Sequence, residues 1–195
     1  MRQASIKRKT KETDVSVFLS LDGQGKNNIS SSCGFLDHML TLFSHHSLFD
    51  IDIKCKGDTE VDFHHSTEDV AIALGECFKS ALADKAGIRR FASNNMAMDE
   101  SLVNVTIDIS SRPHLSFNCD FPSEKVGDFD TELVREFFEA FARESGITIH
   151  INKLQGKNSH HIAEAIFKCF AITLRSAVEI DEKVKSRVPS TKGVI

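Results

Sequence analysis

The first half of the chain alternates between two hydrophobic periods, and these periods predict its secondary structure. Apolar residues at every second position, such as Val15, Val17 and Leu19, are typical of a strand with one buried face. Apolar residues at helical spacing, such as Phe35 and Met39, indicate an amphipathic helix. On these criteria we expect strands at residues 5–13, 14–21 and 51–55, a turn at residues 22–28, and helices at residues 34–47 and from residue 64 to near Gly87.

The second half repeats this order of elements. We expect strands at residues 101–109, 114–120 and 147–151, helices at residues 130–145 and from residue 160 onwards, and a turn at residues 156–158. Each half therefore has the order β-β-α-β-α, and an internal duplication is the simplest explanation. The predicted fold class is α+β, with a first repeat at residues 1–94, a second repeat at residues 95–195, and the helices of both repeats packed together against the sheets.

Composition and charge narrow the class of protein. The 195 residues are 41% hydrophobic and 27% charged, which is typical of a globular protein with a sizeable core. The net charge of −4 and the lack of a dense basic run argue against nucleic-acid binding. Because the sequence has no signal peptide and no apolar stretch of about 18 residues, we expect no membrane partner and a cytoplasmic location. The five cysteines lack CxxC spacing, which favours reduced thiols over disulfides or a zinc–thiolate site.

One motif, His-His-x-x-Glu, occurs at residues 64–68 and again at residues 160–164, and each copy opens a predicted helix. On a helix the first histidine and the glutamate share a face, whereas adjacent histidines diverge by about 100° and cannot both point at one ion. Two such helices side by side would therefore form two metal sites, each with ligands from both repeats. The alternative is a helix start whose glutamate complements the macrodipole and whose histidines are solvated. We favour the metal sites, because such a start does not need paired histidines twice.

The duplication also suggests one further ligand for each site. His38 lies 26 residues before His64, and Glu136 lies at the matching place, 24 residues before His160. We therefore expect site one to contain His38, His65, His160 and Glu164, and site two to contain Glu136, His64, Glu68 and His161. Nitrogen and oxygen ligands suit Mn²⁺, although they do not exclude zinc, iron or nickel. Considered alone, Glu136 would be interpreted as a surface carboxylate of a helix.

Four segments carry the chemistry that distinguishes this sequence. They are Gly34 to Leu40, His64 to Asp69, Ser110 to Pro113, and Asn158 to His161 with Glu164. Together they resemble the imidazoleglycerol-phosphate dehydratase family of histidine biosynthesis, and the resemblance covers essentially the whole chain. It implies a duplicated α+β fold, two Mn²⁺ ions per subunit, and trimers that assemble into a twenty-four-subunit shell with active sites between neighbouring subunits. It also implies the same metal ligands, except that the family often has histidine where this chain has Glu136.

The resemblance further implies roles for residues outside the metal sites. Glu12 matches a catalytic acid/base, with His46 as the next candidate, and both His46 and Lys168 match substrate contacts. The residues that match contacts to the substrate phosphate, for which arginine offers a bidentate fork, are Arg90, Arg112, Ser190, Thr191 and Lys192. In this interpretation the C-terminal tail of the second repeat contacts phosphate.

The implied reaction is a metal-dependent dehydration of imidazoleglycerol phosphate to imidazoleacetol phosphate. Our hypothesis is that both ions bind the imidazole nitrogens of the substrate and lower the pKa of the ring N–H, so that an imidazolate intermediate expels the neighbouring hydroxyl. The main alternative is a dinuclear metallohydrolase acting on a small phosphate ester, which would use the same ligands with a bridging hydroxide. A ferritin-like metal store is disfavoured, because it requires four long helices without the predicted strands.

Overall fold

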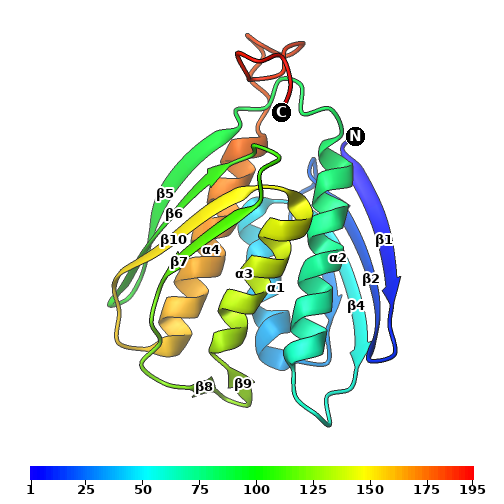
Figure 1. Cartoon of the computed structure of the whole chain (residues 1–195). Helices are drawn as coiled ribbons and strands as arrows, with labels where there is room; N and C mark the ends of the chain where they lie inside the picture. Colours follow the sequence, from blue (N-terminus) through cyan, green and yellow to red (C-terminus); the bar gives the residue numbers. More distant parts are fainter.

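The computed structural model describes all residues from 1 to 195 and places two four-stranded sheets on either side of a layer of four helices (Figure 1). The elements of the first repeat are β1 (Gln3–Lys9), β2 (Thr13–Ser20), β3 (Asn27–Ser30), α1 (Gly34–Ser47), β4 (Asp50–Gly57) and α2 (His64–Leu82). The strand order of their sheet is β1-β2-β4-β3. β3 runs parallel to β4, and the other pairs are antiparallel.

The second repeat has the same topology. Its elements are β5 (Phe91–Met98), β6 (Ser101–Asp108), β7 (His114–Asn118), α3 (Glu132–Ser145), β10 (Thr148–Gln155) and α4 (Ser159–Val178). The strand order is β5-β6-β10-β7, with β7 parallel to β10. A short hairpin of β8 (Lys125–Val126) and β9 (Phe129–Asp130) precedes α3 and has no counterpart in the first repeat. The matching strand orders confirm the duplication, and the α+β fold class is confirmed with it.

Alternation along the strands directs one face of each sheet toward the helices. Val15, Val17 and Leu19 of β2 are buried, as are Val103 and Val105 of β6. α2 packs on β1 and β2, and α4 packs on β5 and β6. Each sheet therefore buries its apolar face under a helix, and the intervening polar residues face outward.

The helices pair across the two repeats, because α2 packs on α3 and α1 packs on α4. Phenylalanines fill the layer between them: the ring centroid of Phe138 lies 5.1 Å from that of Phe167 and 5.0 Å from that of Phe170. Gly75 lies at a close approach of α2 and α3, since a Cβ atom there would be 2.9 Å from the carbonyl oxygen of Phe141. A larger residue at this position would push the two helices apart. None of the four helices has both the length and the apolar character needed to cross a membrane.

Two strands were missing from the sequence prediction. β3 includes Asn27 and Asn28, which we expected to form a turn, because its four mostly polar residues do not alternate visibly. β5 consists largely of small and polar residues, and its whole length pairs with β6. The expected boundary between residues 94 and 95 thus falls inside a strand. We therefore place the division between the repeats before Phe91.

α2 ends before the position that its sequence suggested. The helix stops at Leu82, and Ala83 and Lys85 then adopt positive φ values of 51° and 59°. Gly87, which we expected to end the helix, instead receives the C-terminal tail: its N–H donates to the carbonyl oxygen of Arg187 at 2.8 Å. With φ at +74° and a virtual Cβ only 2.8 Å from the carbonyl oxygen of Lys185, this position requires glycine.

Candidate metal centre

Both histidine-rich motifs lie at the same end of the molecule, where α2 and α4 begin (Figure 1). Asn158 fixes the start of α4, because its side-chain oxygen accepts hydrogen bonds from the N–H groups of His160 and His161 at 2.9 and 3.3 Å. Asp62 accepts a similar bond from the N–H of His64 at 2.7 Å. These polar side chains satisfy the free N–H groups of the first turn, so each helix begins at its motif as predicted.

One cluster of metal-binding side chains forms within a single chain. Oε2 of Glu164 lies 3.5 Å from Nε2 of His38 and 3.3 Å from Nε2 of His160. His38 comes from α1 and the other two residues from α4, and their ligand atoms all lie within 4.8 Å of one another. Imidazole nitrogens and a carboxylate oxygen form a donor group that fits Mn²⁺ or a similar divalent ion. The cluster contains three of the four ligands expected at site one.

The environment of Glu164 favours its ionised form. Burial alone would raise the pKa of this carboxyl group, but the hydrogen bond and charge of Lys168, with a smaller contribution from His38, lower the pKa below its ordinary value. The His38 and His160 side chains are 45% and 41% exposed, so the cluster is open to solvent on the histidine side. A carboxylate that is already ionised can bind a cation without first releasing a proton.

His65, the fourth ligand expected at site one, lies outside this cluster. The expected ligand sets assumed that the two motif helices lie side by side, whereas each of them packs mainly on the shorter helix of the other repeat. His65 therefore begins a different helix pair from His160. The duplicated pattern identified potential ligands, but it contains no information on which helices pair.

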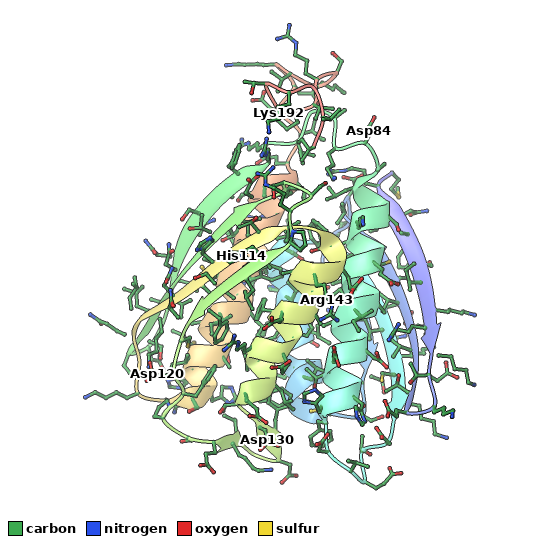
Figure 2. All side chains as sticks on the ribbon, viewed as in Figure 1. Asp84, His114, Asp120, Asp130, Arg143 and Lys192 are labelled. Atoms are coloured by element: carbon green, nitrogen blue, oxygen red, sulfur yellow. The ribbon has the colours of Figure 1, made fainter.

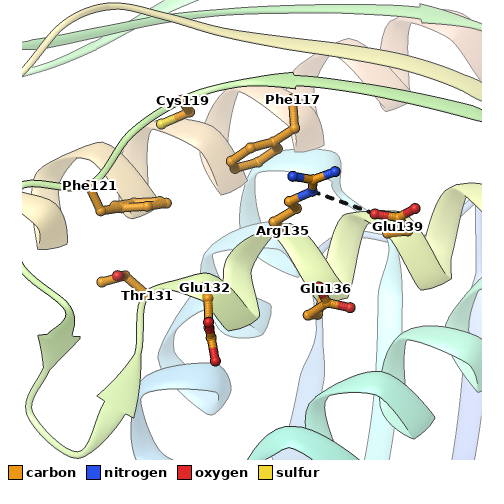
Figure 3. A pocket seen from close by; sticks show the side chains of 8 residues that line it. All are labelled: Phe117, Cys119, Phe121, Thr131, Glu132, Arg135, Glu136 and Glu139. Atoms are coloured by element: carbon orange, nitrogen blue, oxygen red, sulfur yellow. Dashed lines mark ion pairs between the residues drawn. The ribbon is translucent and has the colours of Figure 1, made fainter.

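The ligands expected for site two are not gathered within one chain. Glu68 of α2 instead pairs with Arg143 of α3 at 3.3 Å. Glu136 is partly buried on α3, where it lines a pocket together with Phe117 and Arg135 (Figure 3). In the whole chain, the cluster described above is the only group of three or more such side chains whose ligand atoms lie so close together. The role of Glu136 therefore stays a prediction.

The second histidine of each motif contacts a carboxylate that the sequence analysis missed. Nδ1 of His65 lies 3.0 Å from Asp58, and Nδ1 of His161 lies 2.7 Å from Glu100. These hydrogen bonds are the main cause that raises the pKa of each imidazole, and the bond from His161 is the main cause that lowers the pKa of Glu100 to about 2. Both acids lie in turns, where no hydrophobic period marks them. Glu12, the expected acid/base, is also near, with Oε2 3.8 Å from Nε2 of His65.

The two expected substrate contacts near the cluster, His46 and Lys168, lie on α1 and α4. Lys168 contacts Glu164 directly, and the carbonyl oxygen of His46 accepts a hydrogen bond from Arg175 of α4 at 3.3 Å. Burial, and then the charges of His45 and Lys168, lower the pKa of His46. A neutral imidazole at this position can accept a proton at physiological pH.

The residues expected to contact phosphate lie around Asp108. Nε of Arg90 donates to Asp108 at 2.7 Å, and Nη1 of Arg90 donates to the carbonyl oxygen of Pro189 at 2.8 Å. Nη2 of Arg112 lies 3.6 Å from the same aspartate. Arg90 thus fixes the C-terminal tail beside both arginines, and this tail carries Ser190, Thr191 and Lys192. No sequence pattern marks Asp108, which is one more polar position on a strand.

The expected phosphate contacts and the metal-binding cluster lie at opposite ends of the folded molecule. The N–H of Arg90 donates to the carbonyl oxygen of Ala177 near the end of α4, whereas His160 lies in the first turn of that helix. At 1.5 Å per residue, the helix places roughly 25 Å between the two positions. Figure 2 agrees, with Lys192 and Asp130 labelled at opposite ends of the molecule. We call these regions the metal end and the arginine end.

The sequence matches known enzymes along nearly its whole length. The family model described as imidazoleglycerol-phosphate dehydratase matches residues 31–174. The imidazoleglycerol-phosphate dehydratase of Rhodopseudomonas palustris strain BisB5 is 58% identical over 193 residues, which cover 99% of this chain and 98% of the relative. The enzyme of the same name from Methylorubrum populi is also 58% identical, over 99% of this chain and 99% of the relative.

Two solved structures have the same fold. The imidazoleglycerol-phosphate dehydratase of Staphylococcus aureus superposes with a TM-score of 0.84 at 40% identity, covering 92% of this chain and 99% of its own. The Pyrococcus furiosus enzyme, in complex with (S)-C348, gives 0.82 at 38% identity and covers 97% of this chain and 100% of its own. The sequence matches and the shared fold lead to one conclusion: this chain belongs to the imidazoleglycerol-phosphate dehydratase family of hydro-lyases.

Proposed function

We propose that this chain converts imidazoleglycerol phosphate to imidazoleacetol phosphate and water in histidine biosynthesis, using two divalent metal ions per subunit, with Mn²⁺ as the preferred ion. Family membership supports the dehydration and the pathway. The observation that carries the metal dependence is the cluster of His38, His160 and Glu164. When bound, such ions supply positive charge that lowers the pKa of an imidazole N–H in contact with them.

Proton transfer is assigned to Glu12. Its side chain is 53% exposed, and its carboxylate lies 3.8 Å from the second histidine of the first motif. A carboxylate at this place can remove a proton from the substrate carbon and protonate the departing hydroxyl. His46, whose lowered pKa keeps it neutral, is the alternative acid/base and a candidate substrate contact. Lys168 holds Glu164 by a direct ion pair and adds positive charge beside the cluster.

The arginine end is assigned to the substrate phosphate. Arg112 is 69% exposed and offers a planar fork of N–H donors, which suits a phosphate group. Lys192 is exposed as well, and Ser190 and Thr191 precede it in the tail. Arg90 is only 12% exposed, and it connects the tail to Asp108. Its replacement is therefore expected to disturb the tail in addition to weakening phosphate binding.

The distance between the two ends supports the proposal of a site shared between chains. Imidazoleglycerol phosphate has an imidazole ring, a three-carbon chain and a phosphate, and it is much shorter than the roughly 25 Å of helix that separates the ends. One copy of the chain therefore cannot supply both the metal ions and the phosphate contacts. We propose that neighbouring copies complete each site, in trimers that assemble into a twenty-four-subunit shell of closed symmetry.

The cysteines support a cytoplasmic location. All five are free, and burial raises the pKa of Cys77 and of Cys169 to about 11, so neither is a reactive thiolate. Unpaired, unreactive thiols are typical of proteins that work in a reducing compartment. We therefore assign the enzyme to the cytoplasm.

One assay tests the activity and its metal dependence together. The purified enzyme is depleted of metal with a chelator, and the conversion of imidazoleglycerol phosphate to the ketone is followed before and after Mn²⁺ is added back. We expect activity to disappear on chelation and to return with Mn²⁺. Release of inorganic phosphate in place of the ketone would favour the metallohydrolase. Dehydration that survives complete metal removal would contradict the metal dependence.

Metal should also control assembly, since ligands from separate chains are joined only through the ion. Size-exclusion chromatography is expected to show a smaller particle after chelation and the original particle after Mn²⁺ is restored. A single unchanged mass under both conditions would contradict this coupling.

A further inference from the structure

The second histidine of each motif is held through Nδ1, and the first is not. Asp58 accepts from His65 at 3.0 Å, and Glu100 accepts from His161 at 2.7 Å. Neither His64 nor His160 contacts a carboxylate through Nδ1; His160 instead faces Glu164 through Nε2. The same ring atom is thus held in both repeats, by one acid in each.

The two acids do not occupy equivalent positions in the duplication. Asp58 directly follows β4, whereas Glu100 lies in the tight turn between β5 and β6. The place that corresponds to Asp58, directly after Gly156 at the end of β10, is occupied by Lys157. Inheritance from a common repeat therefore does not explain the match. Each repeat places a carboxylate against Nδ1 of its second histidine from a different position in the fold. This indicates that the contact itself is required.

Stability alone does not account for Asp58. One of its carboxylate oxygens, Oδ1, is buried and has no hydrogen-bond partner, which is unfavourable for folding. The other oxygen is committed to His65. Such a half-satisfied carboxylate is expected where the remaining contact has a functional role.

Glu100 is held in place by backbone. Its Oε1 atom accepts hydrogen bonds from the N–H groups of Lys157 at 3.1 Å and Asn158 at 2.9 Å. Its Oε2 atom is thereby directed at His161. The same loop caps α4 through Asn158, so the carboxylate and the histidine are positioned by one rigid segment.

We propose that Asp58 and Glu100 are positioning residues, which accept the Nδ1 proton of His65 and His161 and so leave Nε2 as the atom presented to a metal ion. The inference rests on the proposed function, because it takes these histidines as metal ligands. Each Nε2 atom already faces a second, exposed carboxylate, Glu12 at 3.8 Å or Asp99 at 3.9 Å, on the side where a cation would be attracted. Carboxylates behind a ligand histidine fix its orientation and increase its basicity.

The test measures Mn²⁺ affinity by competition with a chelator, independently of activity. Asp58→Ala and Glu100→Ala are each expected to bind Mn²⁺ about 10- to 100-fold more weakly than the parent enzyme. Asp58→Asn and Glu100→Gln retain a carbonyl oxygen that can accept from Nδ1–H, so they should lose less. Glu60→Ala removes an exposed carboxylate from the same turn as Asp58 and should keep the parental affinity.

A second measurement reports the tautomer directly. In metal-free protein labelled with ¹⁵N-histidine, the parent should show Nδ1 protonated in His65 and His161, and each alanine variant should show a mixture for the histidine it affects. Should an alanine variant not fold, Asp58→Asn or Glu100→Gln takes its place, with a smaller loss of Mn²⁺ affinity and a smaller change of tautomer expected.

Two outcomes separate this inference from the proposed function. A parent enzyme that binds Mn²⁺, with alanine variants of equal affinity and unchanged tautomer, would overturn the positioning role alone. A parent enzyme that binds no divalent metal would overturn the proposed function and this inference with it.

Discussion

The metal end and the arginine end of the molecule present different side chains on different kinds of backbone. At the metal end, histidines project from the first turns of helices, and the one carboxylate in their cluster is buried and ion-paired with Lys168. At the arginine end, the candidate ligands come from irregular backbone, in which Arg90 and Ser111 have φ values of 72° and 56°. Side chains at helix ends are held rigidly, which suits an ion that needs fixed ligands. Loops and a tail can instead close around a phosphate.

Each end is prearranged, and under the proposed function neither is complete by itself. The metal end holds three candidate ligands together and lacks His65, which begins the other helix pair. The arginine end has its arginines neutralised in part by Asp108 and holds none of the clustered candidate metal ligands. Under the proposed function each end therefore needs the other, and the length of α4 would keep one copy from supplying both.

The largest effect is expected at the metal end, from Glu136→Ala. Counting ion and ligand charges only, two histidines and two carboxylates neutralise a divalent ion, so removal of Glu136 should empty the second site, halve the metal content and remove most activity. Glu136→His should keep both metals, because the family accepts histidine there. Elemental analysis gives the stoichiometry, and Glu139→Ala, an exposed acid one turn further along α3, is the control. Two metals per chain with full activity in Glu136→Ala would mean that Glu136 is only a surface carboxylate.

Glu12→Gln should lower kcat by about 10²- to 10⁴-fold while the metal content stays full. The amide keeps the size of the side chain and removes its charge, so chemistry is affected more than binding. Steady-state kinetics and elemental analysis on the same preparation measure both. Near-normal kcat would assign the acid/base role to His46.

At the arginine end, Arg112→Ala should weaken the binding of a phosphate-bearing substrate analogue by about 10- to 100-fold, since a charge-assisted fork is lost. Arg89→Ala is a matched control, because Arg89 is also exposed and pairs only with Glu179 at 3.3 Å. Calorimetry compares the two variants. If both variants bind the analogue with equal affinity, Arg112 does not contact the phosphate.

The smallest effect should come from Arg143→Ala, between the two ends. Its partners Glu68 and Glu144 are partly exposed, so the free energy of unfolding should change by less than about 0.5 kcal/mol. Metal affinity at the second site should increase, because Glu68 is released. A large loss of stability in a thermal melt, with unchanged metal affinity, would mean that the pair is structural.

Regular patterning explains which parts of this fold could be predicted. α1 was predicted with its observed bounds, Gly34–Ser47, because its apolar residues keep a helical period and the chain changes period on both sides. β3 and β5 were missed, since short or polar strands at positions of weak burial have little alternation. The pairing of α1 with α4, and of α2 with α3, depends on contacts between distant segments and is not encoded in any local period.

The same limit applies to the site. His38, His160 and Glu164 were predicted because a repeated motif and a duplication identify chemically matched positions, and the structure brings these three together. Asp58, Glu100 and Asp108 act only through partners distant in sequence, so nothing in their own neighbourhood distinguishes them from solvated acids. The distance between the metal end and the arginine end depends on how α4 spans the molecule, which no local sequence pattern specifies.

The most direct test of the account combines the two ends in mixed particles. His160→Ala disables the metal end, and an Arg90→Ala, Arg112→Ala double variant disables the arginine end; the two chains are produced together with different tags and co-purified. If each site takes its metal end and its arginine end from different chains, random association should restore about one quarter of the sites, although each variant alone is inactive. Mixed particles that contain both chains and a full metal complement at the intact metal ends, yet show no activity above the two variants alone, would contradict a site shared between chains.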